Sequence, residues 1–158
     1  MTENGAQGTV QANAGQIISN GGAVKSNVKG GSIGTNAADG VVEANAGEIF
    51  TNAGEVTGNR EDGLIGKNAS GAKVGENAGQ IYLNEDGATV RKNTGIIGAF
   101  NEDGTPEEGT GTGNKGVIET NSGTVQNLGT ITLNLEGGTV DNLKGSVVSL
   151  NKIGRAHV

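Results

Sequence analysis

A β-branched residue followed three positions later by asparagine recurs along almost the whole chain, within the pattern Gly-x-(Val/Ile)-x-x-Asn. The first units are GTVQAN at 8–13 and GQIISN at 15–20. An amphipathic helix needs apolar residues at i, i+3, i+4 and i+7, whereas here one strong apolar residue occurs about every eight residues. β-Branched stretches bounded by Gly and Asn predict short strands. Repetition at this spacing predicts an all-β parallel solenoid (β-helix) with about eight residues per side, in which each unit stacks on its neighbours.

The β-branched residues of these units are the predicted core. Valine and isoleucine alternate without exception from Val10 to Ile97. Each side chain is expected to point inward and to stack on its counterparts in adjacent coils. The predicted core ladder consists of Val10, Ile17, Val24, Ile33, Val42, Ile49, Val56, Ile65, Val74, Ile81, Val90, Ile97, Ile118, Val125, Ile131, Val140 and Val147.

The asparagine of each unit is expected to end its strand, because Asn tolerates left-handed backbone geometry and bonds to nearby main chain. Stacked asparagines can also form a side-chain ladder. The glycine two to four residues later is expected to supply a positive φ or a close approach at the corner. The predicted ladder consists of Asn13, Asn20, Asn27, Asn36, Asn45, Asn52, Asn59, Asn68, Asn77, Asn84, Asn93 and Asn121.

A longer duplication lies over the short one. The segments ANAGQIISN (12–20), ANAGEIFTN (44–52) and ENAGQIYLN (76–84) recur at intervals of 32 residues, which indicates a duplicated four-strand block. One coil could then hold two, three or four strands, or about 16, 24 or 32 residues. Precedent favours three-sided coils, whereas the strict Val/Ile alternation favours an even number, because each column would then be chemically uniform.

The length fits one domain. Residues 1–7 are expected to be a lead-in and residues 8–151 the solenoid. At 101–115 the pattern lapses into a stretch that contains the only proline, Pro106, and we expect a loop that leaves a corner. Such insertions are easily tolerated, although loops on rigid scaffolds often carry function.

Residues 152–158 lie outside the repeat. Ile153–Val158 (IGRAHV) resembles the translation of a short-read sequencing adapter joined in frame. That resemblance implies a gene from an assembled, metagenomic contig and a natural protein that continues beyond Asn151. We therefore expect no catalytic role for His157, the only histidine.

Composition narrows the function. A chain with 32% hydrophobic residues and 31 glycines would ordinarily suggest disorder, but a solenoid needs only a thin apolar core. The absence of cysteine excludes disulfides and thiol chemistry. The net charge of −6 argues against a nucleic-acid partner. No segment is long and apolar enough for membrane insertion, and the N-terminus shows no signal peptide.

At the family level, the recurring unit N-x-G-x-(I/V), as in NAGQI, NAGEI, NSGTV and NLGTI, resembles the β-helical passenger repeats of bacterial autotransporter adhesins. The resemblance covers roughly residues 8–151. It implies an extracellular or cell-surface protein that presents a rigid, protease-resistant rod. We expect its partners to be further copies of itself, joined end to end, or surface glycans and proteins. No binding residues carry over, because these passengers share no common site motif.

Candidate chemistry is sparse. Adjacent acidic residues occur at Glu61/Asp62, Glu85/Asp86, Glu102/Asp103 and Glu107/Glu108. Glycoside hydrolysis needs two carboxylates across a groove, but neighbours at a glycine corner are more simply solvated turn residues. We therefore expect no enzyme activity and no cofactor. Calcium at these corners stays open, since carboxylates suit it, although the nonapeptide of calcium-binding β-rolls is absent.

The function expected from the sequence is a structural or adhesive surface rod. The alternatives are a self-assembling filament subunit, a carbohydrate-binding or carbohydrate-active β-helix, and an ice-binding solenoid. Ice binding calls for a regular threonine array, and only Thr130-Ile131-Thr132 fits. The series Ile18, Phe50 and Tyr82, at 32-residue intervals, is either an exposed stripe for a partner or a cover for neighbouring glycines.

Overall fold

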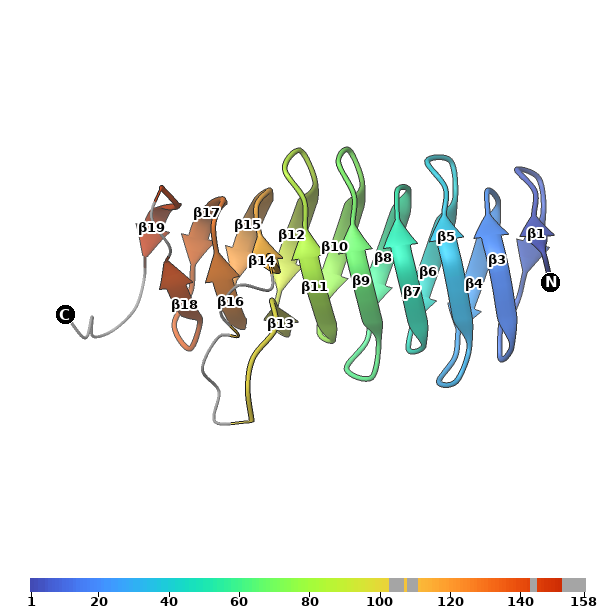
Figure 1. Ribbon diagram of the computed structural model, residues 1–158, viewed down its shortest axis with the longest axis horizontal. Helices are drawn as coiled ribbons and strands as arrows, with labels where there is room; N and C mark the ends of the chain where they lie inside the picture. The colour runs from blue at the N-terminus through green and yellow to red at the C-terminus, as the bar shows by residue number, and fades with distance from the viewer. Residues whose placement is uncertain (103–106, 108–110, 143–144, 152–158) are drawn as a thin grey trace.

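The chain folds as a parallel β-solenoid in which two sheets face each other across a thin core (Figure 1). The computed structural model describes residues 1–102, 107, 111–142 and 145–151. Across these residues the solenoid has about 9 turns of about 16 residues. The strands pair in parallel, as the repeat predicted.

Strands alternate between the two sheets along most of the chain. Sheet A comprises β1 (Glu3–Asn4), β3 (Gln16–Asn20), β5 (Ser32–Asn36), β7 (Glu48–Asn52), β9 (Leu64–Asn68), β11 (Gln80–Asn84), β13 (Ile96–Ile97), β14 (Gly113–Asn114), β16 (Thr124–Asn127) and β18 (Thr139–Asn142). Sheet B comprises β2 (Thr9–Val10), β4 (Ala23–Asn27), β6 (Val41–Asn45), β8 (Glu55–Asn59), β10 (Lys73–Asn77), β12 (Thr89–Asn93), β15 (Val117–Asn121), β17 (Thr130–Asn134) and β19 (Val147–Asn151).

Each coil therefore holds two strands, and the three-sided coil favoured by precedent is wrong. The alternation of the core residues explains the outcome, because two strands per coil place Ile17 beside Ile33 and Val24 beside Val42. Up to Ile97, isoleucine fills sheet A and valine fills sheet B, so side chains of equal size stack in each column. Close packing of this kind favours columns of uniform shape.

The core is the predicted line of β-branched side chains. Fourteen described residues from Ile17 to Ile131 form one buried cluster, with Val10, Val140 and Val148 partly buried against it. Burying each Val or Ile contributes roughly 1.5–3 kcal/mol before the cost of ordering the chain. The prediction of Val147 as a core residue is wrong, because its side chain is 50% exposed and Val148 pairs with Ile131 instead. Val148 keeps the usual three-residue distance to Asn151 but not the usual two-residue distance from Gly145.

The asparagines form two continuous ladders, one per sheet. The side-chain amide Nδ2 of each asparagine donates to Oδ1 of the asparagine in the next coil, as in Asn36 to Asn52 at 2.8 Å and Asn45 to Asn59 at 2.8 Å. The sheet A ladder runs Asn4, Asn20, Asn36, Asn52, Asn68, Asn84, Asn114, Asn127, Asn142. The sheet B ladder runs Asn13, Asn27, Asn45, Asn59, Asn77, Asn93, Asn121, Asn134, Asn151. All twelve predicted asparagines belong to these ladders, together with six more.

The same amide groups also bond to the main chain, so the ladders hold the corners. Asn36 Nδ2, for example, lies 3.0 Å from the carbonyl oxygen of Gly40. None of the described non-glycine residues has a positive φ, so the laddered asparagines do not use the left-handed geometry that Asn tolerates. The corner glycines supply both features that were expected of them. Gly30, Gly71, Gly87 and Gly137 have a positive φ, whereas a Cβ on Gly40 would collide with the carbonyl oxygen of Asn20 and with Oδ1 of Asn36.

The insertion leaves the middle of a strand, where a corner was expected. β13 pairs with the first half of β11 through Ile81 and Ile97, and β14 pairs with its second half through Asn84 and Asn114. The two short strands thus replace one strand of sheet A, and the chain departs after Gly98, whose φ is +125°. Gly113 and Asn114 belong to the solenoid despite the predicted loop boundary at 115.

The ends of the chain add two details. β1 pairs with β3 through Asn4, so the first strand lies within the expected lead-in, residues 1–7. β16 and β18 have four residues where most strands have five, and they pair through Val125 and Val140. Residues 152–158, with His157, lie outside the described residues.

Candidate functional site

The outward face of sheet B carries a series of charged side chains, which lie directly before or after the core residue of each strand. On each strand, one residue before and one residue after the core residue point away from the core, because successive side chains alternate. The charged members on β4 to β15 define the charged face: Lys25, Glu43, Glu55, Lys73, Arg91 and Glu119. All six are exposed.

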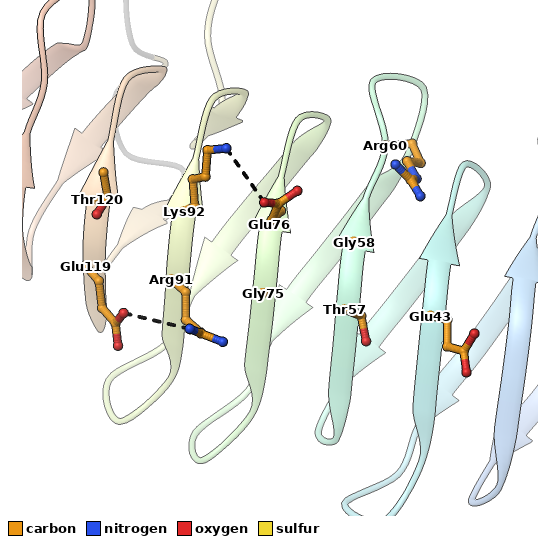
Figure 2. Close-up of a pocket in the computed structure, with 10 residues that line it drawn as sticks. All are labelled: Glu43, Thr57, Gly58, Arg60, Gly75, Glu76, Arg91, Lys92, Glu119 and Thr120. Atoms are coloured by element: carbon orange, nitrogen blue, oxygen red, sulfur yellow. Dashed lines mark ion pairs between the residues drawn. The ribbon is translucent and has the colours of Figure 1, made fainter.

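A shallow depression of about 510 Å³ lies at the centre of the charged face (Figure 2). Its floor is low because Thr57, Gly58 and Gly75 have small side chains or none. Charged side chains from β6, β10, β12 and β15, and from the corner after β8, surround it in Figure 2. The further lining residues are Glu43, Arg60, Glu76, Arg91, Lys92, Glu119 and Thr120.

Most of these charges are paired along the solenoid axis. Arg91 Nε lies 3.9 Å from Glu119 Oε2, and Lys92 Nζ lies 3.6 Å from Glu76 Oε1 (Figure 2). Lys25 pairs with Glu43 in the neighbouring coil. Such exposed pairs contribute about 0–1 kcal/mol each. The depression is therefore an open, zwitterionic surface, and it lacks the enclosure that would exclude water from a reaction.

Of the acidic pairs singled out in the sequence, Glu61/Asp62 and Glu85/Asp86 lie at corners, Glu102 and Glu107 belong to the insertion, and none of these residues lines the depression. Asp62 pairs with Lys29 at 3.3 Å, and Glu85 pairs with Lys67 at 3.7 Å. Asp103 and Glu108 lie outside the described residues. Among the residues that the structure describes, no group of three or more His, Asp or Glu side chains is placed to hold a metal ion.

The outward face of sheet A differs in kind. Ile18, Phe50 and Tyr82 lie in one column on β3, β7 and β11 and are 55%, 52% and 38% exposed; we call them the apolar stripe. The two intervening coils carry Gly34 and Gly66 in the same column. A Cβ on either glycine would meet the carbonyl oxygen of the preceding coil. The glycines thus fit close main-chain approach, and the large side chains stand beside positions without side chains.

The outward columns show no regular threonine array within the described residues. The columns after the core residue hold Lys25, Glu43 and Thr57 in sheet B, and Ile18 and Gly34 in sheet A. Thr130 and Thr132 flank Ile131 on β17, as the sequence predicted. The neighbouring strand β15 has valine and glutamate at those positions, so the threonine pair is not repeated there.

Searches of known protein families, curated proteins and solved structures found no match to this chain. In the described ranges, no helix is long and apolar enough to cross a membrane. The sequence identified the apolar stripe through its 32-residue interval. It missed the charged face, because the charges of Lys25 and Glu43 become neighbours only when the coil holds two strands.

Proposed function

We propose that this chain is a non-enzymatic structural or adhesive surface protein that presents a rigid solenoid rod. The observation that carries the proposal is the contrast between inside and outside. The described core repeats Ile and Val in columns held by two asparagine ladders, whereas the outward columns change from coil to coil. An invariant scaffold with a variable surface suits a protein whose contacts are made by its sides.

The apolar stripe is the surface that we assign to adhesion. Its side chains are large, exposed and aligned along the rod, so they can lie against an extended partner such as a surface glycan or protein chain. Scattered exposed apolar residues are common, but three in one column at regular intervals form a contact line. Removing them from water on binding would supply the driving force.

Adhesion of protein-coated beads to immobilised polysaccharides and extracellular proteins tests this proposal. We expect binding to at least one surface, and a reduction of at least about fivefold in the double variant Phe50→Ser/Tyr82→Ser. Val117→Ser removes an exposed apolar residue from sheet B and is the matched control. Release of reducing sugar from the polysaccharide, or adhesion that is equal in all three proteins, would overturn the assignment.

A self-assembling filament subunit is the second candidate, and the polarity of the ladders favours it. Within the described residues, each bond of the two ladders runs from Nδ2 of one asparagine to Oδ1 of its C-terminal neighbour. A copy stacked coil on coil would continue the same bonds. Light scattering coupled to size exclusion, with negative-stain microscopy of the peak, distinguishes concentration-dependent fibres from a discrete species.

A further inference from the structure

The order of charges on sheet B is self-complementary, and we infer that the charged face binds a second copy of this chain. The two solenoid axes would be antiparallel. The two-fold axis would run along the strand direction, midway between β8 and β10. This inference does not depend on the adhesive role, which we assign to the opposite sheet.

The complementarity is clearest in the column formed by the residues that directly follow the core residue on each strand of sheet B. From β4 to β15 its charges read plus, minus, neutral, neutral, plus, minus. The residues are Lys25, Glu43, Thr57, Gly75, Arg91 and Glu119. A second copy in the reverse direction presents minus, plus, neutral, neutral, minus, plus. Every charged side chain of this column then faces an opposite charge, so that Lys25 meets Glu119 and Glu43 meets Arg91.

The column before the core residue behaves in the same way. Glu55 on β8 and Lys73 on β10 are its charged members, and they are register neighbours at the centre of the face. In the antiparallel arrangement Glu55 of one copy faces Lys73 of the other, twice. The flanking positions carry no charge, because Ala23 meets Val117 and Val41 meets Thr89.

The depression provides room at the two-fold axis. Thr57 would face Gly75 there, so no large side chain separates the copies. Gly58 would face Glu76 of the other copy, and Arg60 lies over Gly58: a Cβ on that glycine would be 3.9 Å from Arg60 Nε. Within the described part of the chain Arg60 forms no ion pair, which leaves its guanidinium available to Glu76 of the other copy.

The charges also select the register. Sliding the copies by one strand puts the two-fold axis on β8, where the two Glu55 side chains face each other and Lys25 faces Arg91. Sliding the other way puts the axis on β10, where the two Lys73 side chains face each other and Glu43 faces Glu119. Both shifts place like charges together, which disfavours them. Of these three registers, only the central one pairs all six charges with opposite charges.

Net charge does not oppose the contact. The chain carries −6, but the charged face holds three cations and three anions. The excess negative charge therefore lies elsewhere on the molecule. Two copies can approach through this face without the repulsion that their total charge implies.

The size of the face predicts a weak, salt-sensitive dimer. Six strands about 4.8 Å apart, each about five residues of 3.3 Å long, cover about 475 Å² per copy. The total of about 950 Å² lies among weak and transient interfaces. Its contacts are exposed charge pairs, which salt screens.

Sedimentation velocity over a concentration series tests the inference. We expect a monomer–dimer equilibrium whose dissociation constant rises at least about tenfold when sodium chloride is raised from about 50 to about 500 mM. Glu55→Lys alone places lysines opposite Lys73, and Lys73→Glu alone places glutamates opposite Glu55. Each variant should weaken the dimer at least about tenfold, because symmetry applies each repulsion twice.

An equimolar mixture of the two variants gives the decisive result. In the mixed pair the two substituted side chains face each other, and the unchanged Lys73 of one chain faces the unchanged Glu55 of the other. All four central positions therefore form opposite charges again, and we expect the mixed dimer to form within about threefold of the wild-type dissociation constant. Glu48→Lys on sheet A changes the net charge equally and should alter the dissociation constant by less than about twofold. Far-ultraviolet circular dichroism confirms that each variant folds.

Four results would overturn the inference. Three of them are a monomer at every concentration in low salt, a mixture that stays dissociated while both variants fold, and higher oligomers in place of a dimer. Higher oligomers would indicate end-to-end stacking. Loss of dimer in Glu48→Lys to the same extent as in Glu55→Lys would assign the contact to sheet A and overturn the inference as well. The first three results do not bear on adhesion by Phe50 and Tyr82, whereas a contact on sheet A would involve the face that carries the apolar stripe.

Discussion

Sheets A and B share one scaffold and differ in what they bury and what they present. Both end most of their strands with a laddered asparagine, at Asn52 and Asn59 for example. From β3 to β13, sheet A buries isoleucine and presents an apolar stripe, whereas sheet B buries valine and presents alternating charges. Stacking constrains the inward positions of both sheets, whereas the outward positions are free to diverge between the two faces of one rod.

The shared ladders should account for the largest effects. Asn52→Leu in sheet A and Asn59→Leu in sheet B each remove two side-chain bonds between coils and leave buried amide groups without partners. We expect each to lower the free energy of unfolding by about 3–5 kcal/mol. Urea titration followed by circular dichroism measures it, with Thr57→Val as the surface control. A loss in only one sheet would show that the ladders are not equivalent.

The valine column and the isoleucine column of the core should differ in how a change of side-chain volume affects stability. Val56→Ile adds a methylene to the valine column and is expected to cost about 1–3 kcal/mol through overpacking. Ile49→Val removes one from the isoleucine column and should cost about 0.5–1.5 kcal/mol. The same titration measures both. If Val56→Ile instead stabilises the protein, the valine column contains unused space and the two sheets are interchangeable inside.

The outward faces should give the smallest effects on stability. Phe50→Ser on sheet A and Arg91→Gln on sheet B are each expected to change the free energy of unfolding by no more than about 0.5 kcal/mol. Thermal and urea unfolding measure this directly. A loss above about 1 kcal/mol for Phe50→Ser alone would show that the ring covers the glycines beside it, and would weaken its assignment to adhesion.

The sequence predicted the residues of the fold better than their arrangement around the axis. The core from Val10 to Ile131 and the laddered asparagines follow from the repeat, because each unit has the same chemistry in the same place. Val147 was misplaced because it sits at the right distance from Gly145, whereas the structure turns Val148, three residues before Asn151, toward the core. The insertion was placed at a corner because nothing in the sequence shows that a strand can be split between its core residue and its asparagine.

The repeat alone is enough to predict a stacked parallel solenoid, since a single apolar residue per unit can be buried only by its neighbours. It also determined most of the residues that line the core and the ladders. The tertiary structure alone decided that two strands complete a coil. That choice sets which outward residues become neighbours, and so it creates both the apolar stripe and the self-complementary charged face. The register between neighbouring coils depends on how many residues complete one coil, and the local pattern of a single strand does not specify that number.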